Sequence, residues 1–241
     1  MARIKLYDQT VNIVRPEPPQ TDLSPRQRAD AQRNRNHLLS SAAATFTQEG
    51  PRVTMQRIAQ NADVGIGTLY RHFPDRAALL AALSHRAFLA VLQLARASRA
   101  AQADPFLALL HFMRGTISHR DVLVLPLHGA PVTASPADVL IRRAISAELD
   151  QILQLGQQAG TLRQDVNATD IIMFGAMLAQ AMPRFPDPVL AAERAAQIFI
   201  DGLRASGSPL PGQPVSRSEM EAAFRTQPEA AASLVSEERQ P

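Results

Sequence analysis

Residues Val53–Leu80 have the sequence VTMQRIAQNADVGIGTLYRHFPDRAALL, which contains two short helical patterns with a break between them. Thr54 is a good helix-capping residue, and apolar residues follow it at the three- and four-residue spacing of a helix. The tripeptide Asp-Val-Gly at 63–65 interrupts this pattern, and a second apolar face follows. Two short helices joined by a turn of three or four residues form a helix-turn-helix. We therefore predict helices over 54–62 and 66–73.

The second of these helices has one face that can be buried and one that is left free. Leu69 and Phe73 share a face and can pack against the first helix. The residues available to the outer face are Ile66, Gly67, Thr68, Tyr70, Arg71 and His72. A recognition helix contacts base edges with its N-terminal residues, and tyrosine and histidine can donate to phosphate oxygens. The shape alone fits both DNA binding and ordinary helix packing.

The chain on either side of this segment is also helical in pattern. Ser24–Pro25 supplies a cap and a proline at the first helical position, and Gly50–Pro51 ends the helix that follows. Further helices are predicted at 75–99, 104–118, 135–159, 169–182 and 188–205. The predicted fold class is therefore all-α.

The two ends of the chain differ in composition from the helical part. Three prolines in four positions stop any helix near residue 19, and residues 207–241 are rich in Pro, Ser, Gln and Glu. A short helix is predicted only around Glu219–Arg225 of that tail. The predicted divisions are a flexible N-terminal arm at 1–23, a helix-turn-helix domain at 24–76, a second helical domain at 77–206 and a disordered tail at 207–241.

Composition limits the classes of protein that this chain can belong to. Hydrophobic residues make up 46% of the 241 residues, which is enough for a buried core, and the absence of cysteine excludes disulfides and thiolate metal sites. The net charge is only +3, but residues 24–76 hold eight arginines against four acidic residues, and a local basic excess attracts phosphate. The longest apolar run, Ile171–Ala179, is shorter than the roughly 20 residues of a membrane span. With no apolar signal at the N-terminus, we expect a cytoplasmic protein with no membrane partner.

The segment Val53–Leu80 closely resembles the DNA-binding signature of the tetracycline-repressor (TetR) family. The likeness consists of the threonine cap, the Ile-Ala pair, the Val-Gly turn and the run Gly-Thr-Leu-Tyr-x-His-Phe before a basic residue. It extends upstream over RADAQRNRNHLLSSAAATFTQEG, Arg28–Gly50, which is similar to the family's first helix. TLRQDVNATDI, Thr161–Ile171, resembles the loop before the family's penultimate helix. The resemblance implies an N-terminal three-helix DNA-binding domain and a divergent C-terminal helical domain for ligand binding and dimerisation.

The resemblance also implies roles for individual residues in DNA binding. These are Thr54 at a phosphate, Gln56 toward the major groove, Ile66, Gly67 and Thr68 at base edges, Tyr70 and His72 at the DNA backbone, Arg71 in specificity and Arg76 as a further cation. Ile66 departs from the polar residue sometimes found there, and an apolar side chain can only contact a thymine methyl or exclude water. Arg28, Arg33 and Arg35 precede the apolar face of the first helix. They either contact DNA or form a solvated helix face.

A member of this family uses the second domain to bind a small-molecule effector and to form a homodimer, whose symmetry implies a pseudo-palindromic double-stranded DNA operator. The last two predicted helices have small residues on one face, which can meet a second copy or pack internally. They are Gly175, Ala176, Ala179, Ala191, Ala192, Ala195 and Gly202. The candidate pocket residues, which also suit an ordinary core, are Phe106, Leu110, Met113, Ile117, Leu123, Met173, Phe174 and Met177.

Other classes of function have less support. The sequence has no Gly-x-Ser-x-Gly motif, no Gly-rich phosphate loop and no His-Glu-x-x-His motif, so we do not expect an enzyme. His111, His119 and His128 lack the spacing and the neighbouring carboxylates of a metal site, and no cofactor is expected. The predicted function is a dimeric DNA-binding transcriptional regulator, a repressor released by its effector. The alternative is a module that binds a protein partner and has weak DNA affinity.

Overall fold

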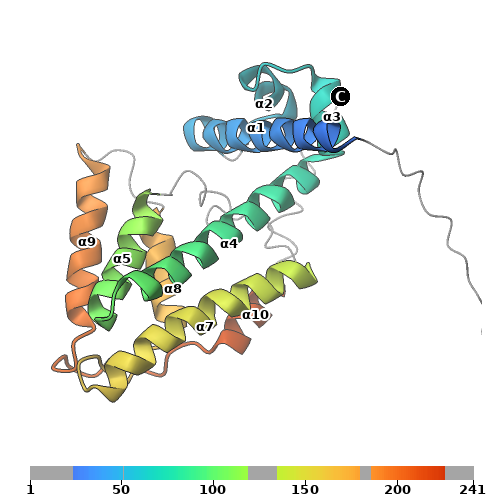
Figure 1. Ribbon diagram of the computed structural model, residues 1–241. Helices are drawn as coiled ribbons and strands as arrows, with labels where there is room; N and C mark the ends of the chain where they lie inside the picture. The colour runs from blue at the N-terminus through green and yellow to red at the C-terminus, as the bar shows by residue number, and fades with distance from the viewer. Residues whose placement is uncertain (1–23, 51, 119–134, 180–185, 226–241) are drawn as a thin grey trace, which may run out of the picture. The chain divides into compact units, whose positions relative to one another are not determined.

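The computed structural model describes residues 24–50, 52–118, 135–179 and 186–225 (Figure 1). Apart from one isolated bridge between Leu162 and Arg204, the regular secondary structure of these residues is helical, so the predicted all-α class is confirmed. In chain order the helices are α1 (Pro25–Glu49), α2 (Met55–Asn61), α3 (Ile66–His72), α4 (Arg76–Ala101), α5 (Pro105–Ser118), α7 (Pro136–Gln158), α8 (Ala168–Ala179), α9 (Pro188–Gly202) and α10 (Arg217–Arg225).

Local sequence signals set several helix ends. At the start of α1, the backbone N–H of Gln27 donates to Ser24 Oγ (3.3 Å), and the N–H of Ser24 donates to Gln27 Oε1 (2.8 Å). This reciprocal capping box gives partners to two backbone donors. Gly50 (φ +87°) and Gly160 (φ +69°) follow α1 and α7 in the left-handed region that favours glycine. The predicted start of α1 and the predicted ends of α1 and α7 are confirmed.

The chain divides into two compact units, residues 1–34 and 35–241, and the division falls within α1. The described part of the first unit, residues 24–34, is a polar helical segment in which Arg33 pairs with Asp30. The second unit contains two apolar cores.

The first core is formed by α1, α2, α3 and the start of α4. It includes Phe46, Ile58 and Leu69, each at most 2% exposed. α4 contributes residues as far as Leu83. The core of the helix-turn-helix therefore continues past the predicted domain boundary at residue 76.

The second core is formed by α4, α5, α7, α8 and α9. One member from each helix, in that order, is Leu92, Leu109, Leu149, Ile171 and Ile200. α4 therefore contributes to both cores, and it is the element through which they are joined in sequence (Figure 1).

Among the described residues, α4 has the length and apolar composition of a membrane span. Those two properties are weak evidence, because the core helix of a soluble protein shares them. Two residues in the middle of α4 make polar contacts with other helices. His85 Nδ1 lies 2.5 Å from Asp138 Oδ1, and Arg86 Nη2 donates to the Leu39 carbonyl (3.0 Å). Since its apolar residues fill two cores, we interpret α4 as a core helix.

Residues 207–225 correct the prediction of a disordered tail. Arg142 of α7 donates through Nε and Nη2 to the two carboxylate oxygens of Glu221 in α10, each at 2.7 Å. These side chains are 7% and 9% exposed, and Met220 is buried beside them. The prediction is wrong for this range because α7 supplies partners that the composition of the tail does not reveal. Residues 226–241 lie outside the described residues, as does the predicted arm at 1–23.

The first residues of this C-terminal segment are fixed by a second ion pair. Arg163 donates to both oxygens of Asp165 (2.5 and 2.8 Å) and to the Ser208 carbonyl (2.6 Å). The Leu210 N–H donates to Asp165 Oδ2 (2.9 Å). The hydrogen bond from Arg163, and after it the one from Leu210, holds the pKa of Asp165 well below its usual range. The carboxylate therefore stays charged and keeps both donors even in moderately acidic solution.

Replacing Glu221 tests whether α10 is part of the folded structure. Glu221→Gln removes the carboxylate that neutralises Arg142, and losing one member of a buried ion pair should lower the free energy of unfolding by about 3 kcal/mol. Urea denaturation measures this change. The control Asp201→Asn removes an exposed pair with Arg204 and should change it by less than about 0.5 kcal/mol. Equal stability of Glu221→Gln and the parent protein would contradict the docked arrangement.

Candidate nucleic-acid interface

The apolar side of α3 is buried in the first core. Leu69 and the residue after the helix, Phe73, are both 0% exposed, so their predicted packing is confirmed. In the turn before α3, Asp63 has a φ of +53°, a left-handed conformation that aspartate tolerates better than most residues. Because the turn and the buried side are fixed, the opposite side of α3 faces outward.

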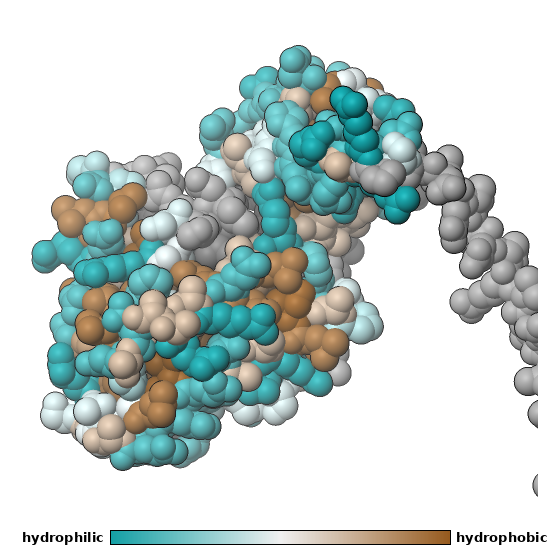
Figure 2. All heavy atoms as spheres, in the orientation of Figure 1, coloured by the Kyte–Doolittle hydropathy of each residue, from teal (hydrophilic) through white to brown (hydrophobic). Residues whose placement is uncertain are grey.

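The outward side of α3 carries most of the residues predicted to bind DNA. Ile66 is 39% exposed and Tyr70 is 46% exposed. Arg71 is exposed, and its Nη2 donates to the hydroxyl of the half-buried Thr68 at 3.3 Å. His72 is also half-buried. The surface of this part of the molecule is mainly hydrophilic on the face drawn in Figure 2.

The start of α2 is also exposed. Thr54 caps α2, because its Oγ1 accepts the backbone N–H of Arg57 at 3.2 Å, and Gln56 is exposed in the first turn. A Cβ atom built on Gly65 or Gly67 would meet nothing within 4 Å. Neither glycine has a positive φ, so the fold itself does not require glycine at these two positions.

The structure corrects the prediction that Arg76 contacts DNA. Its side chain is buried rather than directed outward: Nη1 donates to the Val53 carbonyl, and the guanidinium lies 5.2 Å from the ring centre of Phe46. The sequence placed a cation at the start of α4 correctly, but the carbonyl and the ring to which it binds come from distant elements. We therefore leave Arg76 out of the interface.

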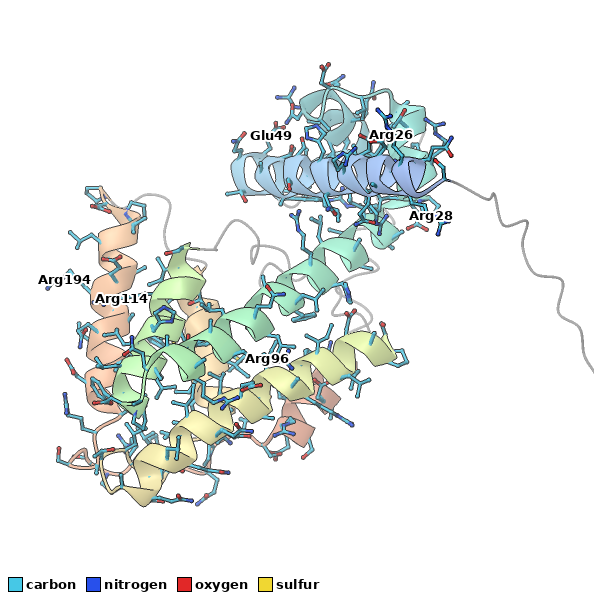
Figure 3. The ribbon with its side chains drawn as sticks, viewed as in Figure 1. Arg26, Arg28, Glu49, Arg96, Arg114 and Arg194 are labelled. Carbon is cyan, nitrogen blue, oxygen red and sulfur yellow. The ribbon has the colours of Figure 1, made fainter. Side chains whose placement is uncertain are left out.

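An ion-pair network between α1 and α2 was not predicted. Arg57 Nε donates to both oxygens of Glu49 (2.9 Å each), and Asn61 Nδ2 donates to Glu49 Oε1 (2.9 Å). Hydrogen bonds from Arg57 and then from Asn61 lower the pKa of the Glu49 carboxyl. Glu49 is at the C-terminal end of α1 (Figure 3). Because these residues are 8 and 12 positions apart, no helical spacing signals the network.

The candidate pocket residues do not form one set. Leu110, Met113 and Ile117 of α5 are buried in the second core, and Phe106 and Phe174 are half-buried against it. Met173 and Met177 are 50% and 58% exposed, so the described residues do not enclose them with the others. Three- and four-residue spacing places them on the outer side of α8, whereas the buried side belongs to Ile171 and Leu178. Leu123 lies outside the described residues.

No group of three or more metal-ligating side chains occurs in the described ranges. His111 instead has its Nδ1 2.9 Å from the hydroxyl of Ser98 on α4. His119 and His128 lie outside the described residues.

Two family models match the chain. The model described as bacterial regulatory proteins of the tetR family covers residues 38–83, and the model of the SbtR-like transcriptional regulator C-terminal domain covers residues 104–205. The solved TetR transcription regulatory protein of Mycobacterium vanbaalenii is 34% identical, with a TM-score of 0.51, and the match covers 73% of this chain and 98% of that one. The chain belongs to the TetR family.

Other TetR-family proteins match less of the sequence. The transcriptional repressor KstR of Mycobacterium tuberculosis is 33% identical over 129 residues, which is 53% of this chain and 57% of KstR. The chain thus spans a little over half the length of that relative. AibR, solved in complex with isovaleryl coenzyme A and operator DNA, is 17% identical with a TM-score of 0.56, over 73% of this chain and 100% of AibR. At that identity the likeness to AibR shows the fold alone.

Replacing the cap of α2 tests the local basis of the interface. Thr54→Ala removes the oxygen that accepts the Arg57 N–H and should lower the free energy of unfolding by about 1 kcal/mol. Thr54→Ser keeps the hydroxyl and should stay close to the parent protein. Thermal denaturation followed by circular dichroism measures both. If the alanine variant is as stable as the serine variant, the hydroxyl does not stabilise α2.

Proposed function

We propose that this TetR-family chain is a homodimeric, sequence-specific DNA-binding regulator of the cytoplasm, a repressor released by a small-molecule effector. The observation that carries the proposal is the outward side of α3, where Ile66 and Tyr70 are exposed beside Arg71. On the opposite side of the helix, Leu69 is buried in the first core. The family match supports the same assignment, because it covers the whole helix-turn-helix.

The residues of α3 have chemistry suited to a major groove. Thr68 and Arg71 can bond to base edges, and Ile66 can contact a thymine methyl. Tyr70 and His72 can donate to phosphates on either side. The open space around Gly67 supports this arrangement, since a small residue that the fold does not need lets a DNA surface approach the helix closely. Thr54 and Gln56 would add contacts from α2.

We propose that two copies pair through α8 and α9. Met173, Met177, Leu190 and Ile198 are each at least half exposed, which is costly for apolar side chains in a monomer and favourable in an interface. The small residues expected there do not form this surface as a group. Gly175 lies 3.7 Å from Met113, measured from an added Cβ, and Ala192 is 3% exposed, so both pack inside the chain.

The assignment of separate functions to the two domains remains part of the proposal. The domain at 24–76 binds DNA, and the domain at 77–206 binds the effector. KstR is named a repressor, and AibR was solved with both a ligand and DNA, so related folds support both activities. An effector that prefers a different spacing of the two α3 helices would lower operator affinity. The unliganded spacing should match one DNA turn, about 34–36 Å, or a multiple of it.

Titration with DNA tests the proposed function. We expect the protein to bind the DNA flanking its own coding region at least about a thousandfold more tightly than a scrambled sequence, with strong salt dependence. Arg71→Ala should lower operator affinity at least about tenfold, whereas Arg114→Ala, which removes an exposed arginine of α5, should not (Figure 3). Equal binding to both DNAs, also after unfolding and refolding without ligand, would favour the protein-partner alternative.

The proposed dimer has its own test. Ile198 is 70% exposed in the single chain, and Ile198→Glu replaces it with a charged side chain. This variant should be a monomer where the parent protein is a dimer, as measured by sedimentation equilibrium. Leu140→Glu, on an α7 side chain that is 64% exposed, should leave the dimer intact. Loss of dimerisation should also reduce operator affinity, because one α3 helix contacts only one half-site. A dimeric Ile198→Glu variant would place the interface elsewhere.

A further inference from the structure

Two polar side chains of α1 reach the C-terminal ends of the two helices of the helix-turn-helix. Arg35 Nη1 donates to the carbonyl of His72, the last residue of α3, at 3.1 Å. His37 Nε2 lies 3.2 Å from the carbonyl of Ala62, the residue that ends α2. Each of these contacts joins residues more than 20 positions apart in the sequence.

The two contacts satisfy a general need of helix ends. The last carbonyls of a helix have no partner within it, and the negative end of the helix dipole favours a cation there. Arg35 meets both requirements at α3, and its guanidinium also lies 4.5 Å from the ring centre of Phe73. The planar group therefore binds the carbonyl through an N–H and the ring through its face.

α3 has a small buried contact. It is seven residues long, and Leu69 is its buried residue, with Phe73 following directly after it. A short helix held mainly by two apolar side chains can tilt about that contact. Arg35 bonds to the end of the helix beyond Leu69, where a restraint has the most effect on tilt.

We infer that Arg35 is a positioning residue for the DNA-contacting helix, and that His37 has the same role for α2. The inference rests on the proposed DNA-binding function. Arg35 then sets operator specificity by orienting Ile66, Thr68 and Arg71, and its own guanidinium makes no contact with phosphate. This replaces the sequence-based expectation that Arg35 either touches DNA or lies on a solvated helix face.

Salt dependence separates a positioning role from a phosphate contact. Each phosphate neutralised by a cation contributes about 0.9 to the slope of log K against log salt concentration. Removing a phosphate contact lowers this slope and weakens binding to operator and to non-operator DNA alike. Removing a positioning residue should weaken operator binding and leave the slope for non-operator DNA unchanged.

The experiment compares Arg35→Gln, Arg35→Lys and the control Arg33→Gln by fluorescence titration with operator and scrambled DNA over a range of salt concentrations. Arg33 is an exposed arginine of the same helix, and its side chain is 70% exposed. Arg35→Gln should lower operator affinity about tenfold or more with non-operator affinity unchanged. Arg35→Lys should recover only part of the loss, since lysine can donate to the carbonyl but cannot stack as a planar group. Arg33→Gln should keep the operator-to-scrambled ratio of the parent protein.

Two outcomes would overturn the inference. Because the proposed homodimer carries two copies of Arg35, a fall in slope of about 1.8 for both DNAs, with full recovery in Arg35→Lys, would make Arg35 a phosphate contact. An unchanged operator-to-scrambled ratio in Arg35→Gln would show that the residue has no part in specificity.

Amide hydrogen exchange gives a second readout that does not need DNA. In Arg35→Gln the amides at the C-terminal end of α3 should exchange faster while those of α2 keep their rates, and His37→Ala should show the reverse. If the parent protein does not discriminate between operator and scrambled DNA, the proposed function fails, and the exchange pattern still tests the contacts. Uniformly faster exchange across the first core would show that Arg35 serves only general stability, which contradicts a positioning role.

Discussion

The continuity of α4 through two separate apolar cores is the constraint on which the rest of the structure depends. Its first turns complete the core under α3, and its later turns complete the core of α5, α7, α8 and α9. Between these stretches, Arg86 donates to the Leu39 carbonyl and His85 pairs with Asp138. A displacement of the second core would therefore be transmitted along α4 to the first. In the proposed regulator, we expect effector binding to reach α3 by this route.

The C-terminal segment adds a further restraint on α4 that the matched family models do not include. The second family model ends at residue 205, and the buried pair of Arg142 and Glu221 lies partly beyond it. The guanidinium of Arg142 also lies 5.4 Å from the ring centre of Phe88 on α4. α10 therefore neutralises a cation that is packed between α7 and α4. A buried cation needs such a partner, so the position of α7 against α4 depends on residues beyond the range that the family model matches.

Local signals in the sequence predicted most of the fold, and long-range contacts account for the errors. Ser24, Thr54, Gly50 and Gly160 act on backbone within a few residues of themselves, so their effects could be predicted. The exposed side of α3 followed from helical spacing in the same way. Arg76 instead turns inward to a carbonyl 23 positions away, and Glu221 finds Arg142 at a separation of 79. Neither pairing has a periodic signature, which is why a buried cation was expected outside and a docked segment was expected to be disordered.

The same distinction explains how a short α3 can have a defined orientation. The residues that would touch DNA are contiguous and visible in the sequence, but a seven-residue helix has little intrinsic stability, so its direction must be imposed by its surroundings. Leu69 and Phe73 fix which side is buried, and a bond from Arg35, 37 positions earlier, restrains its far end. Base contacts have strict geometry, and small errors in tilt break them. In the proposed interface, specificity would therefore depend on supporting residues of α1 as well as on the side chains that face the groove.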